Sequence, residues 1–158
     1  SSWGSNVNVK IPVTNTKGEF TGPIIKELAE SGVKLNITAI FTVNQVEEIA
    51  KNLSPNTFAI ISVFAGRIAD SGIDPMPVMR KCVEILKDLP KAELLWASPR
   101  ELLNIIQADE VGCHIITATP GILNKLALLG KDLTEFSLDT VKMFYNDATA
   151  AGYKIKAN

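Results

Sequence analysis

Several features that define common protein classes are missing from this sequence of 158 residues. It has only two cysteines, Cys82 and Cys113, and no CxxC pair, so neither a disulfide framework nor a cysteine zinc site is expected. No block of like charge stands out among its 16 basic and 17 acidic residues, which argues against a nucleic-acid partner. No apolar run approaches the ~20 residues that cross a membrane. With reduced cysteines, these absences predict a cytoplasmic protein that binds neither nucleic acid nor membranes.

Glycine-rich phosphate-binding motifs are also missing. Neither GxGxxG nor GxxxxGK followed by Ser or Thr occurs, which disfavours a nucleotide-binding doubly wound sheet. The rest of the composition is that of a folded chain, because 46% of the residues are hydrophobic and 21% are charged. We therefore expect one domain over residues 1–158.

Short apolar stretches alternate with segments of helical periodicity along the chain. The apolar stretches predict five strands, at residues 6–13, 35–41, 58–64, 92–98 and 112–119. Helices are predicted at residues 22–32, 43–53, 75–89, 99–109, 120–130 and 134–152. This α/β alternation of near-continuous apolar strands with helices indicates a parallel sheet covered on both faces, in a doubly wound sheet or a (β/α) barrel.

Polar residues within the predicted strands, or just after them, help to choose between these two folds. They are Lys10, Asn36, Thr38, Ser62, Arg67, Ser98, Arg100, Thr117 and Thr119. Active sites of (β/α) barrels draw side chains from the carboxyl ends of several strands, so this distribution favours the barrel. A complete barrel has eight strands, whereas the sequence predicts five.

Lys10 stands within an apolar stretch, and strand alternation places it on the face opposite Val9 and Ile11. An ammonium on a buried face must be paired, neutral or directed into a polar cavity. The simpler interpretation is a lysine that reaches solvent from a strand edge. The functional interpretation is a partly buried amine that acts as a nucleophile towards a carbonyl.

Two arginines follow neighbouring predicted strands. Arg67 comes after an Ala-Gly pair that allows the chain to bend, and alone it is typical of a solvated loop cation. Ser98 and Arg100 end the fourth strand, next to a helix predicted to open at Pro99. A hydroxyl, an arginine and a helix N-terminus predict an anion site, and the second arginine favours phosphate.

Four ordered motifs resemble a known family. VKIPVT, NITAIFT, FAGRI and ASPRE follow one another at helix-length spacings, and together they resemble the transaldolase family, especially its small single-domain branch that includes the fructose 6-phosphate aldolases. The resemblance runs from about Asn6 to Leu129. It implies an eight-stranded (β/α) TIM barrel in which this chain supplies strands four to eight and a C-terminal helix. Three βα units, about 60 residues, would then precede it.

The resemblance implies a reaction as well as a fold. Lys10 would form a Schiff base with a ketose phosphate, and Thr38 would hold the water that moves protons while the Schiff base forms. A dihydroxyacetone unit would pass to an aldose phosphate, as in the pentose phosphate pathway. No metal and no cofactor would be needed, because the protonated imine is the electron sink.

Substrate-binding roles follow from the same resemblance. Asn36 would bind the sugar hydroxyls and Ser62 the dihydroxyacetone end, while Arg67, Ser98 and Arg100 would bind the phosphate. Without the residues upstream of strand four, which carry the family's acid and base, a fragment alone would be a poor catalyst. The sugar phosphates would be the partners. In the small branch of the family a C-terminal helix packs on a neighbouring subunit, so the resemblance implies a homo-oligomer in which the amphipathic segment 134–152 makes that contact. A helix that caps its own barrel is the alternative.

Phe64 bears on the alternatives within the family. Transaldolases typically have phenylalanine here and the aldolases tyrosine, so Phe64 favours transfer over fructose 6-phosphate aldolase activity, although simple packing would also explain it. A noncatalytic sugar-phosphate-binding or assembly domain is the third interpretation. Two residues, Val63 and Pro99, depart from the family pattern. His114 is the only histidine of the sequence, and we interpret it as a packed strand residue rather than a general base.

Overall fold

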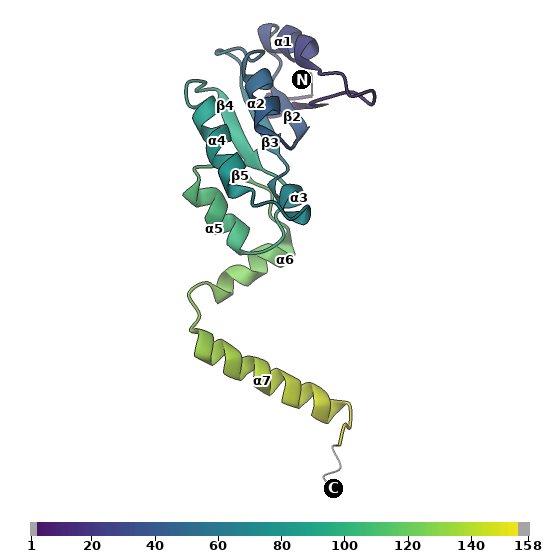
Figure 1. The fold of residues 1–158 in the computed structure, drawn as a ribbon, viewed down its shortest axis with the longest axis vertical. Coiled ribbons are helices and arrows are strands. Elements are labelled where there is room, and N and C mark those ends of the chain that lie inside the picture. Colours follow the sequence, from purple (N-terminus) through teal and green to yellow (C-terminus); the bar gives the residue numbers. More distant parts are fainter. Residues whose placement is uncertain (1–2, 155–158) are drawn as a thin grey trace. The chain divides into compact units, whose positions relative to one another are not determined.

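The chain divides into two compact units, Ser1–Leu123 and Asn124–Asn158. The computed structural model describes residues 3–154 and is shown in Figure 1. Within that range, none of the helices combines the length and the apolar character needed to cross a membrane.

The first unit is a parallel sheet with flanking helices. Its strands are β1 (Val9–Pro12), β2 (Leu35–Ile40), β3 (Ala59–Val63), β4 (Ala92–Trp96) and β5 (Ile115–Ile116). Its helices are α1 (Gly22–Glu30), α2 (Val43–Ala50), α3 (Ala65–Asp70), α4 (Met76–Leu86), α5 (Leu103–Glu110) and α6 (Pro120–Leu123). All strand pairs are parallel.

The order of the strands in the sheet distinguishes the two predicted folds. The five strands lie in the order β1-β2-β3-β4-β5, so each strand pairs with the next one in the sequence. A doubly wound sheet reverses its strand order at a switch point, whereas a (β/α) barrel does not. The predicted fold class is therefore confirmed as an α/β structure with consecutive βα units, consistent with part of a TIM barrel.

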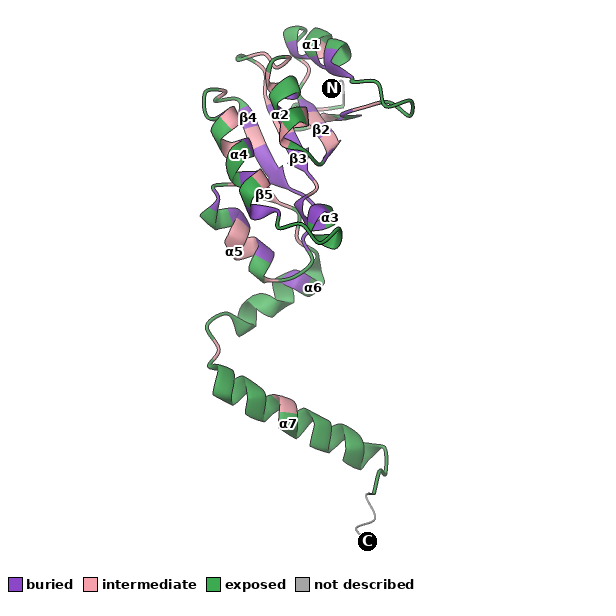
Figure 2. Ribbon diagram, in the orientation of Figure 1, coloured by how far each residue is buried: buried purple, intermediate pink, exposed green. Residues whose placement is uncertain are grey.

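The two faces of the sheet differ in burial. One face, called here the helix-covered face, carries the buried residues Ile11, Leu35, Ile37, Ala59, Ile61, Ala92 and Leu94. These residues form one core cluster with side chains of α1, α2, α4 and α5, and the purple segments of Figure 2 mark the buried positions.

The other face, called here the open face, carries the alternate residues. They are Lys10, Pro12, Asn36, Thr38, Ile60, Ser62, Glu93 and Leu95. Only Ser62 and Leu95 among them are buried. Among the described residues the helices contribute to the core on one face only, and most positions of the open face are not buried.

Local capping explains where several helices begin and end. Pro23 opens α1, and Gly32 follows its end with a φ of +77°, a conformation that favours glycine. The capping box of α2 joins Thr42 and Gln45, each side chain accepting a backbone N–H of the other. These signals are local in sequence, which is why the predicted and observed helices agree here.

The second unit contains the 3-10 helix η1 (Asn124–Leu128) and α7 (Leu133–Ala150). The carboxylate of Asp132 caps α7 by accepting the N–H groups of Thr134 and Glu135. Lys131 Nζ lies 2.6 Å from Asp139 Oδ2 and 4.9 Å from the centre of the Phe136 ring. Together the cap and the ion pair stabilise the first turns of this helix.

Candidate active site

Lys10 lies on the open face of β1, directly across from Asn36 of β2. Its neighbour Ile11 is buried on the other side of the strand, so the alternation predicted for this stretch is confirmed. The Lys10 side chain is exposed, however, whereas partial burial was expected. The reason is its position, because β1 is the first strand of the sheet and β2 is its only neighbouring strand among the described residues.

A hydrogen bond fixes Asn36 on the open face. Ser62 of β3 donates from Oγ to Asn36 Oδ1 over 2.8 Å, and Ser62 is only 3% exposed. The oxygen of the Asn36 amide therefore faces Ser62, and its two N–H donors are left for another acceptor. Two of the predicted substrate-binding residues are thus brought together beside Lys10.

Thr38 lies at an irregularity of β2. The register between β2 and β3 shifts between Ile37 and Ile40, and Ala39 has a φ of 61° in the left-handed region. The Thr38 Oγ1 is buried and has no hydrogen-bond partner among residues 3–154. Bulges re-aim side chains near functional sites, and a buried hydroxyl without a partner is costly unless it binds a water or ligand.

Phe64 and Arg67 stack at the start of α3. The Cζ of Arg67 lies 5.1 Å from the centre of the Phe64 ring, which in turn lies 5.7 Å from the ring of Phe41. Arg67 was expected in a loop, and the structure places it on α3 instead. This six-residue helix escaped prediction because it is short and its N-cap, Phe64, makes no side-chain cap.

Gly66 allows a close approach of two segments. A Cβ atom at Gly66 would lie 1.5 Å from the carbonyl oxygen of Ser98, and the Gly66 N–H donates to the carbonyl of Ala97 over 3.2 Å. The small size of Gly66, which was expected to let the chain bend, is thus also required for this contact. Ser98 itself has a φ of 59°. The helix that carries Arg67 is thereby packed against the loop that carries Ser98.

Arg100 is held at both its backbone and its side chain. Its N–H donates to Asn104 Oδ1 over 2.7 Å, while its Nε donates to Asp70 Oδ1 over 3.0 Å and its Nη2 to Asp70 Oδ2. The hydrogen bond from Arg100 holds the pKa of Asp70 below its usual value, and the same contact raises the pKa of Arg100. Both side chains are about half exposed.

The prediction that a helix opens at Pro99 is wrong. α5 begins at Leu103 and not at Pro99, and Asn104 Oδ1 accepts the N–H groups of both Arg100 and Glu101. These two amides therefore have a protein partner already, and the segment ahead of α5 is a loop closed by a side chain.

The contacts link the predicted site residues in two groups. Lys10, Asn36 and Ser62 form the first group on the open face. Phe64, Arg67, Ser98 and Arg100 form the second, joined through Gly66 and Asp70. The sequence interpretation missed Asp70 and Asn104. A signal for Asp70 did exist, since it follows Arg67 by one helical turn, but its partner lies on another βα unit.

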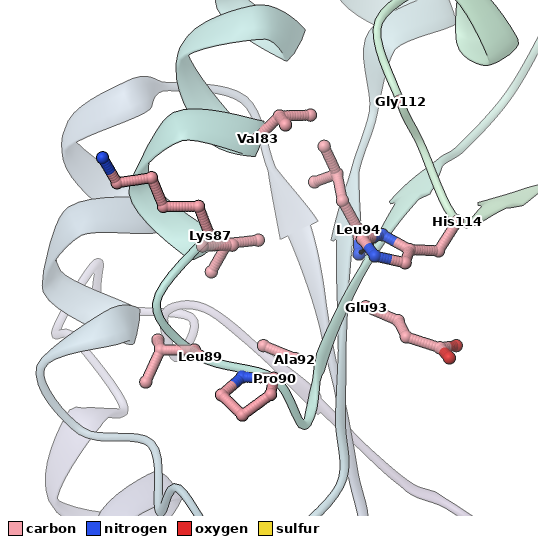
Figure 3. Close-up of a pocket in the computed structure, with 10 residues that line it drawn as sticks. Val83, Lys87, Leu89, Pro90, Ala92, Glu93, Leu94, Gly112 and His114 are labelled. Carbon is pink, nitrogen blue, oxygen red and sulfur yellow. Dashed lines mark hydrogen bonds between the residues drawn. The ribbon is translucent and has the colours of Figure 1, made fainter.

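A cavity of about 280 Å³ lies near the beginnings of β4 and β5, away from both groups. Figure 3 shows its lining, with Lys87, Glu93 and His114 among the polar residues. Contrary to the expectation of a packed residue, His114 is exposed, and its Nδ1 accepts the N–H of Leu94 over 3.1 Å. Among the described residues, no group of three or more His, Cys, Asp or Glu could hold a metal ion.

With this geometry in place, comparison with known proteins decides the family. Residues 1–157 match the model of the transaldolase/fructose-6-phosphate aldolase family. The chain belongs to this family. The resemblance predicted from the four motifs is thus confirmed over nearly the whole chain.

Individual relatives agree with the family match. A probable transaldolase of Nitrosopumilus maritimus is 31% identical over 156 residues, which is 98% of this chain and 66% of that protein. A probable transaldolase 2 of Listeria monocytogenes is 36% identical over 127 residues, 80% of this chain and 55% of the relative. A probable transaldolase of Herpetosiphon aurantiacus is 32% identical over 143 residues, 88% of this chain and 61% of the relative. The chain thus spans 55% to 66% of the length of these family members.

Proposed function

We propose that the protein is a transaldolase-type transferase that moves a dihydroxyacetone unit from a ketose phosphate to an aldose phosphate through a Schiff base on Lys10. The observation that carries this proposal is the placement of Lys10 beside Asn36, whose amide is fixed by Ser62. A nucleophilic amine next to an oriented hydrogen-bond donor is what a ketose needs for carbonyl attack and for recognition of its hydroxyls.

The reaction forms and breaks bonds at the carbonyl carbon C2 and between C3 and C4 of the ketose. The neutral amine of Lys10 adds to C2, and uptake of one proton with loss of water leaves a protonated imine. A base removes the proton of the C4 hydroxyl, the C3–C4 bond breaks, and its electron pair forms an enamine as an aldose phosphate leaves. The enamine C3 then adds to the aldehyde carbon of a second aldose phosphate while the protonated base returns its proton to the new C4 oxygen, and water hydrolyses the new imine to free Lys10 and release the proton taken up earlier.

The other residues of the proposed site act on binding and proton transfer. Asn36 donates to the sugar hydroxyls and Ser62 contacts the dihydroxyacetone end. The buried hydroxyl of Thr38 holds the water that carries protons, which would supply the partner that this group lacks within the described chain. Phe64 lines the site without a hydroxyl of its own.

Three residues of the second group bind the phosphate. Arg67, Ser98 and Arg100 lie on two segments that Gly66 keeps in contact. Guanidinium groups recognise phosphate oxygens through paired hydrogen bonds, so two arginines beside a hydroxyl suit a sugar phosphate. We further propose a cytoplasmic homo-oligomer of the pentose phosphate pathway, with residues 1–158 as strands four to eight of one barrel.

Trapping of the Schiff base tests the proposal. Full-length protein incubated with fructose 6-phosphate and borohydride should gain a reduced adduct, mapped by peptide mass to Lys10. Lys10→Met should abolish the adduct, and Lys17→Met, which changes an exposed lysine in a turn, should leave it intact. An adduct that persists in Lys10→Met would sink the proposal.

Fructose 6-phosphate aldolase activity is the second candidate, because the matching family includes both enzymes. An aldolase releases free dihydroxyacetone without an acceptor, whereas a transaldolase transfers it. Dihydroxyacetone release should therefore be slow from fructose 6-phosphate alone, and a new ketose phosphate should form once erythrose 4-phosphate is added. Fast release without the acceptor would favour the aldolase.

A further inference from the structure

We propose that Asp70 is a positioning residue that holds the guanidinium of Arg100 in place for the phosphate of the substrate. This inference rests on the proposed function, because it assigns Arg100 to phosphate binding. Its evidence is the paired contact in which the Arg100 Nε and Nη2 donate to the two carboxylate oxygens of Asp70.

The first argument is geometric. A guanidinium bound through both Nε and Nη2 has its plane fixed, and its Nη1 and the outer N–H of Nη2 remain for another acceptor. Asn104 fixes the backbone of the same residue by accepting the Arg100 N–H. Arg100 is thus restrained at both ends before any ligand arrives, which lowers the entropy lost when an anion binds.

The second argument separates Asp70 from an ordinary surface ion pair. Lys81 with Glu84 and Lys51 with Glu48 join residues one helical turn apart, as expected for pairs on a solvated helix. Asp70 instead reaches from the end of α3 to the loop before α5, and α3 also carries Arg67. One carboxylate therefore links the two segments that hold the proposed phosphate ligands.

The negative charge of Asp70 and its restraint on Arg100 have opposite effects on phosphate binding, which makes the positioning role testable. Removal of the Asp70 carboxylate raises the local positive charge, and charge alone would then tighten the binding of phosphate. Loss of the restraint on Arg100 would weaken it. If Asp70 positions Arg100, Asp70→Ala weakens phosphate binding even though the site becomes more positive.

The experiment compares phosphorylated and unphosphorylated ligands in the full-length protein. In Asp70→Ala, the KM for fructose 6-phosphate and the Kd for inorganic phosphate should rise about two- to tenfold, with kcat nearly unchanged. The concentration of dihydroxyacetone that half-saturates borohydride trapping should not change, since this ketone has no phosphate. Asp70→Glu should restore part of the binding, and Glu84→Gln, which removes an exposed ion pair elsewhere, should have no effect.

The possible results distinguish the positioning role of Asp70 from the proposed transaldolase reaction. An unchanged or lower Kd for phosphate in Asp70→Ala overturns the positioning role, and so does a wild-type protein that binds no phosphate. Weaker phosphate binding in Asp70→Ala by a protein that forms no Schiff base supports the role of Asp70 while refuting the proposed reaction. If Asp70→Ala weakens the trapping of dihydroxyacetone as much as the binding of phosphate, the substitution has a general structural effect. That result also overturns the positioning role.

Discussion

The two faces of the sheet are built from alternate residues of the same strands, yet they differ in burial and in polarity at most positions. On the helix-covered face, Ile37, Ile61 and Leu94 are fully buried and apolar. On the open face, Lys10 is exposed, and Asn36 is bonded to Ser62. The contrast shows that a period of two residues can separate the groups that hold the sheet together from those available for chemistry.

The difference in burial between the two faces also predicts how much each face contributes to stability. Burial of an aliphatic side chain stabilises a fold by about 1.5–3 kcal/mol, whereas an exposed polar group contributes little. Stability should therefore depend on the helix-covered face, and activity on the open face and the loops at the carboxyl ends of the strands. Variants on each face test this separation.

The largest effect on stability is expected at Ile61. Ile61→Ala removes buried methyl groups from β3 and should lower the free energy of unfolding by about 2–5 kcal/mol. Lys10→Met on the open face should change that free energy by less than about 1 kcal/mol while abolishing Schiff-base formation. Urea unfolding and borohydride trapping measure the two properties.

If Ile61→Ala does not fold, Ile61→Val should still lower the free energy of unfolding by about 0.5–1.5 kcal/mol. A Lys10→Met variant as unstable as Ile61→Ala would contradict the separation.

A smaller effect is expected where the two phosphate-binding segments touch. Gly66→Ala places a methyl group against the Ser98 carbonyl oxygen, and relief of that overlap requires backbone movement at about 1–3 kcal/mol. Because the movement displaces the Ser98 loop, the KM for fructose 6-phosphate should also rise. Gly121→Ala is the matched control, since its nearest heavy atom would lie 3.9 Å away. Equal melting temperatures for Gly66→Ala and the wild type would contradict the close approach.

How far the sequence could predict this molecule depends on the distance between interacting residues. Strand alternation around Lys10 and the caps of α1 and α2 were predictable, because each depends on neighbours in the sequence. One local contact was nevertheless missed, because Asn104 lies only four residues after Arg100 and closes the loop there. That hydrogen bond delays the start of α5 to Leu103, against the signal of a proline at the first turn.

In the candidate site, too, residues could be selected from local patterns, whereas contacts between distant segments could not be predicted. Residue types and strand positions were enough to select Lys10 and Asn36, and the structure places them side by side. The pairing of Asp70 with Arg100 joins two βα units, and the role of Gly66 depends on a carbonyl 32 positions further along the chain. Tertiary contacts of this kind leave no periodic pattern in a single sequence.

A still smaller effect on stability is expected at the hydrogen bond between β2 and β3. Ser62→Ala leaves the Asn36 Oδ1 without its donor and should cost about 0.5–1.5 kcal/mol of stability. Because the Asn36 amide then loses its fixed orientation, trapping of dihydroxyacetone should also slow. A double-mutant cycle with Asn36→Ala isolates the interaction between the two side chains. Strictly additive effects of the two substitutions on stability and on trapping would show that the pair is not coupled.

The smallest effect is expected from the titration of Asp70. Its folded-state pKa is lowered by the hydrogen bond from Arg100, so its contribution to stability is present above the unfolded pKa of about 3.9 and is lost as the pH falls through the folded pKa. The melting temperature of Asp70→Asn should therefore be slightly below that of the wild type near neutral pH and should converge with it in acid. High salt should shrink the difference, because both partners are half exposed and screened by solvent. A difference in melting temperature that grows as the pH falls would contradict this prediction. Protonation of Asp70 in the wild type removes the same ion pair that Asp70→Asn has already lost, so the two proteins should become more alike in acid.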